Sequence, residues 1–169
     1  FRCFFVSLRL KLEFWFLNTF LMMKKIILIT GGQRSGKSEY AEKLALSLSP
    51  NPVYMATSRI WDEDFRHRVE MHKQRRGCEW TNIEEEQFLS RHDIAGRTVL
   101  IDCVTLWATN FFFDFQADSL RSAKAAGEHV ERTLNALKEE FDKFTSADAT
   151  FIFVTNEIGS GGVSDNETQ

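Results

Sequence analysis

Four short segments of the chain are apolar at nearly every position, and they cover residues 26–30, 53–58, 98–102 and 150–155. A strand with one face in water alternates apolar and polar residues, whereas a strand covered on both faces reads as a continuous apolar run. We therefore expect these segments to be the strands of a mostly parallel sheet that helices cover on both faces.

Between the strand segments, apolar residues recur every three or four positions, which is typical of one face of a helix. The first such helix follows Ser38 and is ended by Pro50, and its apolar positions are Ala41, Leu44, Ala45 and Leu48. A longer helix is expected to begin near Ser119, with an apolar face formed by Val130, Leu134, Leu137, Phe141 and Phe144. The alternation of strands and helices, without a repeat or a linker, predicts one α/β domain.

Composition narrows the class of protein. Of the 169 residues, 43% are hydrophobic and 27% are charged, as in ordinary soluble globular proteins. The formal net charge of −3 gives no general attraction to nucleic acid or to anionic membranes. The three cysteines lack CxxC spacing, so neither a disulfide framework nor a zinc site is indicated, and we expect a cytoplasmic location.

The two ends of the chain differ from the rest. Residues 1–22 are rich in phenylalanine, but four charged residues interrupt them, and each would cost roughly 2.5–3.5 kcal/mol at the centre of a bilayer. We interpret residues 1–22 as a leader read in frame upstream of a translation start at Met22 or Met23; an amphipathic membrane anchor is the alternative. The chain stops without a closing helix or strand, so we expect a single domain over residues 23–169 that is truncated at its C-terminus.

Residues 31–38 read GGQRSGKS and match the pattern G-x-x-x-x-G-K-[ST] between a predicted strand and a predicted helix. In such a phosphate-binding loop, or P-loop, glycines let backbone N–H groups converge on phosphate oxygens, and the start of the helix adds its positive dipole end. Lys37 would reach the β- and γ-phosphates, and the Ser38 hydroxyl would ligate Mg²⁺. The alternative is a glycine turn with a purely structural role. The pattern predicts a nucleotide-binding fold of the P-loop NTPase (RecA-like) type.

Asp102 is expected to act together with this loop, because it ends the predicted strand 98–102. Open α/β sheets place ligand contacts at the carboxyl ends of their strands. A carboxylate there can hold Mg²⁺ through water, although an aspartate at a strand end can also simply cap the next turn.

The segment 62–76, DEDFRHRVEMHKQRR, has the composition of a charged surface helix. His72 lies at the edge of an apolar face that Phe65 and Val69 begin, and several arginines are near it in the sequence. Nearby cations favour neutral imidazole, which is the nucleophilic form of histidine. On spacing alone, a solvated helix face with a half-buried histidine fits better. The other histidines, His67, His92 and His129, are expected on the surface.

Together these blocks resemble a known family. They are GGQRSGKS after ILIT, then MATSRIWDEDFRHRVEMHKQRR, WTNIEEE, VLIDCVTLWATNFFF and FIFVTNEIGSG. In this order they are similar to the bifunctional adenosylcobinamide kinase / adenosylcobinamide-phosphate guanylyltransferase family of cobalamin biosynthesis. The resemblance covers nearly everything from Met23 to about Asn166. The P-loop alone is generic, whereas the later blocks are specific.

The resemblance implies two reactions at one nucleotide site. The γ-phosphate of ATP or GTP would pass to the aminopropanol hydroxyl of adenosylcobinamide. A histidine would then attack the α-phosphorus of GTP, and the GMP would pass to adenosylcobinamide phosphate. The histidine carried over is His72, which reverses the preference drawn from spacing. Some members have two adjacent histidines, but here the first position is Met71.

The resemblance also implies which residues form the site. Catalytic roles fall to His72 and Lys37, and the Mg²⁺ ligands would be Ser38 and Asp102. The implied nucleotide contacts are Gly31, Gly32, Gln33, Arg34, Ser35, Gly36, Lys37, Ser38, Ala56, Thr57, Ser58, Lys73, Gln74, Arg75, Arg76, Glu84 and Asp102. Members of the family assemble into trimers and continue beyond this C-terminus with a final helix and strand. Two other interpretations stay open: a P-loop kinase of another small metabolite without a covalent intermediate, and a nucleotide-binding fragment without activity.

Overall fold

The computed structural model describes residues 25–32, 34–59, 63–74, 76–114 and 123–157. Within the two helices that span 63–74 and 123–144, the side chains at positions 64, 65, 67, 68, 71, 72 and 123–126 are outside this description. The expectations for residues 1–22 and for the last residues of the chain lie outside the described residues.

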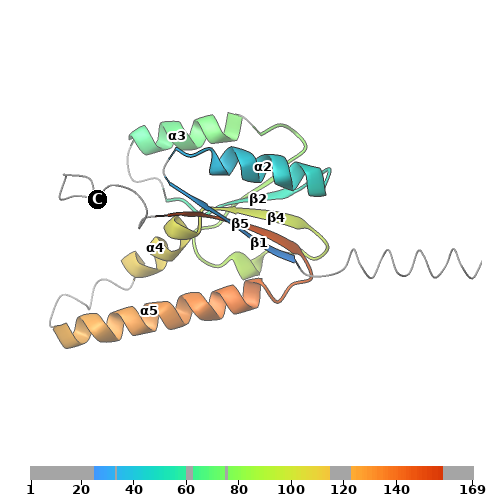
Figure 1. The fold of residues 1–169 in the computed structure, drawn as a ribbon. Helices are drawn as coiled ribbons and strands as arrows, with labels where there is room; N and C mark the ends of the chain where they lie inside the picture. Colours follow the sequence, from blue (N-terminus) through green and yellow to red (C-terminus); the bar gives the residue numbers. More distant parts are fainter. Residues whose placement is uncertain (1–24, 33, 60–62, 75, 115–122, 158–169) are drawn as a thin grey trace, which may run out of the picture.

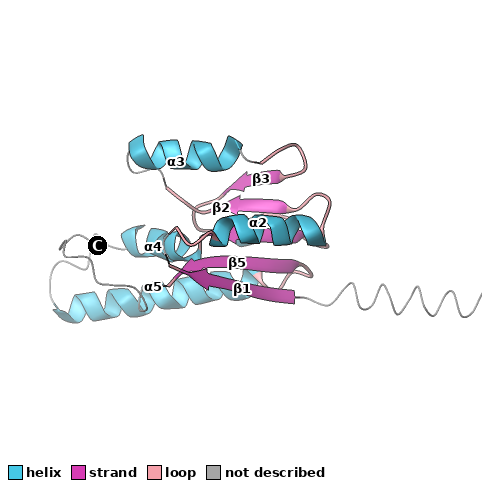
Figure 2. Ribbon diagram, turned by 45° about the horizontal axis from the view of Figure 1, so that its top comes forward, coloured by secondary structure: helices cyan, strands magenta, loops and turns pink. Residues whose placement is uncertain are grey.

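A five-stranded, all-parallel sheet forms the centre of the domain, in the order β1-β5-β4-β2-β3. Its strands are β1 (Lys25–Gly31), β2 (Val53–Ala56), β3 (Thr81–Glu84), β4 (Thr98–Asp102) and β5 (Thr150–Asn156). In Figure 2 the strand arrows point toward the same end of the sheet. The four predicted strands are confirmed, although β2 ends two residues earlier than expected.

Helices lie on both faces of the sheet, as the continuous apolar strands predicted (Figure 1). For the edge strand β1 the prediction of cover on both faces is wrong, because Ile26 and Leu28 are 49% and 64% exposed. On one side lie α2 (Lys37–Leu48) and α3 (Glu63–Gln74), and on the other lie α4 (Val104–Asp114) and α5 (Ala123–Phe144). A short 3₁₀ helix, η1, spans Leu89–Arg91. None of the described helices is long and apolar enough to cross a membrane.

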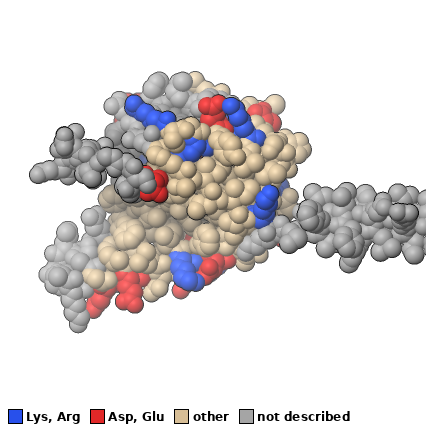
Figure 3. Space-filling view, in the orientation of Figure 1, with Lys and Arg blue, Asp and Glu red and all other residues tan. Residues whose placement is uncertain are grey.

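The sheet separates two cores. On the side of α2, Ala41 and Ala45 pack against Leu100, Ile152 and Val154. On the side of α4 and α5 the core is richer in aromatic residues: Trp107, Phe111, Phe144, Phe151 and Phe153. Figure 3 shows charged side chains mainly along the upper and lower edges of the molecule, where α3 and α5 run. The outer faces of these helices are therefore in water.

The apolar face predicted for α5 is correct only in its last turns. Phe144 is buried, but Val130 and Leu134 are 43% and 51% exposed. The first half of the described helix instead buries His129 and Thr133, because it turns this side toward α4, where the rings of Phe112 and His129 meet edge to face. The Thr133 hydroxyl donates to the carbonyl of His129, which removes the cost of burying it.

The surface positions predicted for three histidines have three outcomes. For His129 the prediction is wrong, because its side chain is buried between α4 and α5. His92 is partly buried, with Nε2 3.4 Å from Oε2 of Glu85. The side chain of His67 lies outside the described residues.

Candidate nucleotide-binding site

The P-loop joins the carboxyl end of β1 to the first turn of α2. Gly36 has a φ of +82°, a conformation that glycine adopts without strain. A Cβ on Gly31 would lie 2.8 Å from the Oγ of Ser35, so a larger residue there would require the Ser35 side chain to move. No side chain caps the start of α2, which begins at Lys37, the lysine of the P-loop. The first N–H groups of the helix are therefore available to an anion.

Lys37 lies back over the loop that precedes it. Its Nζ donates to the carbonyl of Gly32 at 3.1 Å. The ammonium group is thus held beside the turn that would surround a phosphate chain.

A cavity of about 240 Å³ opens in front of the loop, at the carboxyl end of the sheet. Six of the predicted site residues line it: Lys37, Ser38, Ala56, Ser58, Arg76 and Asp102. Tyr54, Val69, Cys103, Leu106 and Asn156 complete its described wall. Residues far apart in the sequence thus meet where an α/β sheet of this kind binds ligands.

The oxygen atoms that line this cavity are suitable ligands for a magnesium ion. Ser38 offers a hydroxyl and Asp102 a carboxylate, and Mg²⁺ prefers oxygen ligands. Among the described residues there is no cluster of three or more histidine, cysteine or acidic side chains that could hold a metal alone. In phosphoryl-transfer sites Mg²⁺ usually shares its coordination with water and substrate phosphates, so it needs few ligands from the protein.

Tyr54 is part of the wall of this cavity and contacts Asp102. Its hydroxyl donates to Oδ2 of Asp102 at 3.0 Å. Burial, and then the negative charge of Asp102, raises the pKa of the Tyr54 phenol well above its usual value. The hydroxyl therefore keeps its proton and stays a donor at neutral pH.

The segment after β2 is fixed by hydrogen bonds from its own side chains and from Asn110 of α4. The hydroxyl of Thr57 is buried and donates to the carbonyl of Cys103, while Asn110 donates to the carbonyl of Thr57. Arg59 forms a two-pronged ion pair with Asp114 and a further bond to Glu86. Ala56 and Ser58 line the cavity, whereas Thr57 stabilises the loop that carries them.

The charged segment forms α3, as predicted. Val69 lines the cavity, and His72 follows it by three positions in the same helix. The side chain of His72, and all of Arg75 and Gln33, lie outside the described residues.

The predicted contacts near the end of α3 separate into two groups. Lys73 forms an ion pair with Glu84 of β3 at the surface, and Gln74 is exposed. Arg76, in contrast, has a side chain only 3% exposed, and its guanidinium stacks 3.6 Å from the centre of the Tyr54 ring. Of these residues, Arg76 alone is part of the described cavity wall.

Comparison with known families places the chain in one of them. The sequence model of the family described as cobinamide kinase / cobinamide phosphate guanyltransferase matches residues 27–169. The chain belongs to this family.

Three relatives support the assignment. The bifunctional adenosylcobalamin biosynthesis protein CobU of Escherichia coli (strain K12) is 36% identical over 80% of this chain and 77% of its own length. The protein of the same name from Salmonella typhimurium is 32% identical over 83% of this chain and 80% of its own. The corresponding protein CobP of Pseudomonas aeruginosa is 35% identical over 80% and 73%.

Within this cobinamide kinase / guanyltransferase fold, two polar cavity residues were not predicted: Tyr54 and Asn156. Asn156 ends β5, so its place at the carboxyl edge of a parallel strand could have indicated it. Tyr54 offers no such signal, because an aromatic residue inside an apolar strand reads as part of the core.

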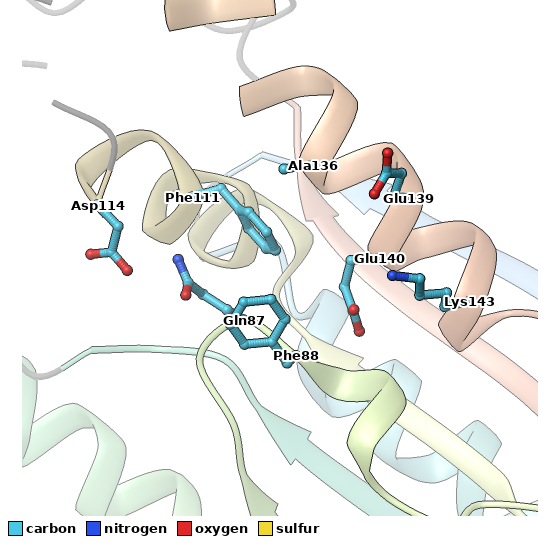
Figure 4. Close-up of a pocket in the computed structure, with 8 residues that line it drawn as sticks. All are labelled: Gln87, Phe88, Phe111, Asp114, Ala136, Glu139, Glu140 and Lys143. Carbon is cyan, nitrogen blue, oxygen red and sulfur yellow. The ribbon is translucent and has the colours of Figure 1, made fainter. Parts of the chain in front are cut away.

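A second cavity of about 210 Å³ lies between α4, α5 and the segment before η1 (Figure 4). Phe88 and Phe111 form its apolar part. Both carboxylate oxygens of Glu140 accept hydrogen bonds from Ser90, and Gln87 donates to the carbonyl of Asn110. These polar groups already have partners within the protein, so they give no indication of a ligand.

Proposed function

We propose that the chain performs both transfers of its family at the cavity described above. The first moves the γ-phosphate of ATP or GTP to the hydroxyl of adenosylcobinamide. The second makes adenosylcobinamide-GDP from GTP and adenosylcobinamide phosphate through a guanylyl-histidine. The observation that carries this proposal is that Lys37, Ser38 and Asp102 line one cavity together with Val69 of the helix that contains His72.

In the kinase step, the substrate hydroxyl attacks the γ-phosphorus and its proton is lost to solvent. The bond between the γ-phosphorus and the bridging oxygen of the β-phosphate breaks, and a nucleoside diphosphate leaves. The residues here mainly orient the phosphate chain and stabilise its charge. Lys37 and the uncapped start of α2 supply positive groups along that chain. When bound, Mg²⁺ adds charge neutralisation on the phosphate oxygens.

In the guanylyl step, a nitrogen of His72 attacks the α-phosphorus of GTP. A P–N bond forms, the bond to the β-phosphate breaks, and pyrophosphate leaves with its charge stabilised by Lys37. A phosphate oxygen of adenosylcobinamide phosphate then attacks the same phosphorus. The P–N bond breaks and His72 returns to its neutral form, so one difficult transfer becomes two easier ones.

The test of this proposal is covalent labelling. The protein is incubated with GTP carrying ³²P at the α-phosphate and separated by denaturing electrophoresis. We expect a label that is lost in acid and kept in alkali, that is absent in His72→Asn, and that persists in His67→Asn, a matched control in the same helix. Label retained in His72→Asn would refute the assigned nucleophile.

The same experiment separates the alternatives. No label, with continued phosphate transfer to an alcohol, would indicate a small-metabolite kinase without a covalent intermediate. Nucleotide binding without either transfer would indicate a binding fragment. A homotrimeric assembly and a cytoplasmic location stay predictions, which gel filtration with light scattering and cell fractionation would check.

A further inference from the structure

Tyr54 contacts two residues of the proposed site at once. Its hydroxyl donates to Oδ2 of Asp102, and its ring lies under the guanidinium of Arg76. All three side chains line the same cavity. These contacts form a continuous row of three side chains: Arg76 after α3, Tyr54 in β2 and Asp102 at the carboxyl end of β4.

The sheet explains why a tyrosine at this position reaches the aspartate. β2 and β4 are neighbours, and Ala56 pairs with Asp102. Tyr54 precedes Ala56 by two residues, so its side chain projects from the same face of the sheet. The length of the tyrosine ring spans the offset between the two positions.

The Tyr54 ring is held on two sides. Trp80 meets it edge to face, with ring centres 5.9 Å apart and planes at 83°. The second group against the ring is the guanidinium of Arg76, which has polar contacts of its own. Its Nε donates to Oδ1 of Asn82, and its Nη1 lies 4.0 Å from Oε1 of Glu42. A cation stacked on an aromatic ring in a buried place is a stabilising arrangement. The hydroxyl of Tyr54 is therefore fixed before any ligand binds.

We propose that Tyr54 is a positioning residue of the nucleotide site: it holds the Asp102 carboxylate in one rotamer, which leaves the other carboxylate oxygen to serve a nucleotide-bound Mg²⁺ directly or through water. The inference rests on the nucleotide site of the proposed function. Groups that orient a ligating carboxylate usually affect metal affinity or activity by about 10–100-fold when they are removed. Tyr54 acts through Asp102 and takes part in neither bond-making step.

The experiment measures nucleotide binding rather than turnover. Calorimetry follows α,β-methylene GTP, whose carbon bridge prevents release of pyrophosphate, binding to the full chain with Mg²⁺ and with EDTA. For wild type we expect Mg²⁺ to strengthen binding. In Tyr54→Phe we expect the gain from Mg²⁺ to fall by about 10-fold or more, while binding in EDTA stays unchanged. A merely structural role would weaken both conditions alike.

A double-mutant cycle assigns the effect to the pair. In Asp102→Asn the gain from Mg²⁺ should be lost, and adding Tyr54→Phe should cause no further loss. Tyr40→Phe is the matched control, because it removes the same hydroxyl from an exposed ring. Losses that add independently, or a Tyr54→Phe variant that behaves like Tyr40→Phe, would overturn the proposal.

A second measurement does not depend on the folding of the Tyr54 variant. The chain has two tyrosines, so Tyr40→Phe grown with fluorotyrosine carries one ¹⁹F probe, at Tyr54. Its resonance should move when Mg²⁺ is added to the nucleotide complex, and an unmoved resonance would contradict the proposal. If these results hold but no labelled histidine forms, the guanylyl transfer fails and the role of Tyr54 stands. If labelling succeeds but Tyr54→Phe leaves the Mg²⁺ dependence unchanged, the guanylyl transfer stands and the proposed role of Tyr54 fails.

Discussion

The two cavities have similar volumes, about 240 and 210 Å³, and different chemistry. The one at the carboxyl end of the sheet collects a lysine, a hydroxyl and a carboxylate beside an uncapped helix start. In the one beside α5, the buried carboxylate of Glu140 is already bonded to Ser90. Volume alone would not separate a binding site from a structural hollow here. The difference is that the first cavity adjoins helix N–H groups that no side chain caps, together with a cation and a carboxylate at the carboxyl end of the sheet.

The largest effect is expected in the second cavity, from Phe111→Ala. Phe111 is buried and meets the rings of Trp107 and Phe88 edge to face. We expect its truncation to lower the free energy of unfolding by about 3–5 kcal/mol, measured by urea unfolding, and to leave nucleotide affinity in the folded protein unchanged. Phe113→Ala, an exposed position in the same helix, should cost far less. A large loss of affinity in folded Phe111→Ala would show that the two cavities are coupled.

The second-largest effect is expected in the first cavity, where a substitution should change activity rather than stability. We expect Lys37→Ala to reduce both the kinase and the guanylyl transfer by about 10²–10³-fold, the usual cost of removing one charge-stabilising group. Urea unfolding should change little, because the Lys37 side chain donates to an exposed loop carbonyl. Lys43→Ala, in the same helix and paired with Glu39 at the surface, is the control. Full guanylylation in Lys37→Ala would contradict a shared site.

The smallest effect is expected from Glu140→Gln. The amide keeps one oxygen for the N–H of Ser90, but its NH₂ group would face the Ser90 hydroxyl, which would have to change from donor to acceptor. Both hydrogen bonds would also lose the charge of the carboxylate. We expect a loss of about 1–3 kcal/mol in the free energy of unfolding, with both transfer rates unchanged. Glu139→Gln, the exposed neighbour, should be close to wild type. If Glu140→Gln slowed either transfer without a change in stability, the second cavity would have a role in binding.

The sequence predicted the elements whose patterns are strong. Four strands and the start of α2 are where continuous apolar runs and the P-loop placed them, although the edge strand β1 is exposed at Ile26 and Leu28. β3 was not predicted, because TNIE is a short edge strand that alternates partly buried and exposed residues. α4 was also missed, since VTLWATNFFFD is apolar almost throughout and shows little helical periodicity.

The site residues likewise divide into those that sequence motifs indicated and those that they did not. Lys37, Ser38 and Asp102 come from motifs with a chemical mechanism, and they lie together in one cavity. Tyr54 could not be found, because its function depends on a diagonal contact between β2 and β4. Arg76 was expected to contact nucleotide, and no pattern in the sequence indicates that its guanidinium packs on a tyrosine ring. Contacts between strands distant in the chain carry no local signal.

The first turn of α2 has no capping side chain, and this makes the stability of the fold depend on whether a ligand is bound. Gly36 supplies no capping side chain, so a bound phosphate would complete the hydrogen bonding that the polypeptide leaves open at this helix. A ligand that binds only the native state at a hundred times its dissociation constant adds about 2.7 kcal/mol to stability. The melting temperature of this protein should therefore follow the nucleotide concentration around it, and the chain would be most resistant to unfolding and proteolysis when its substrates are abundant.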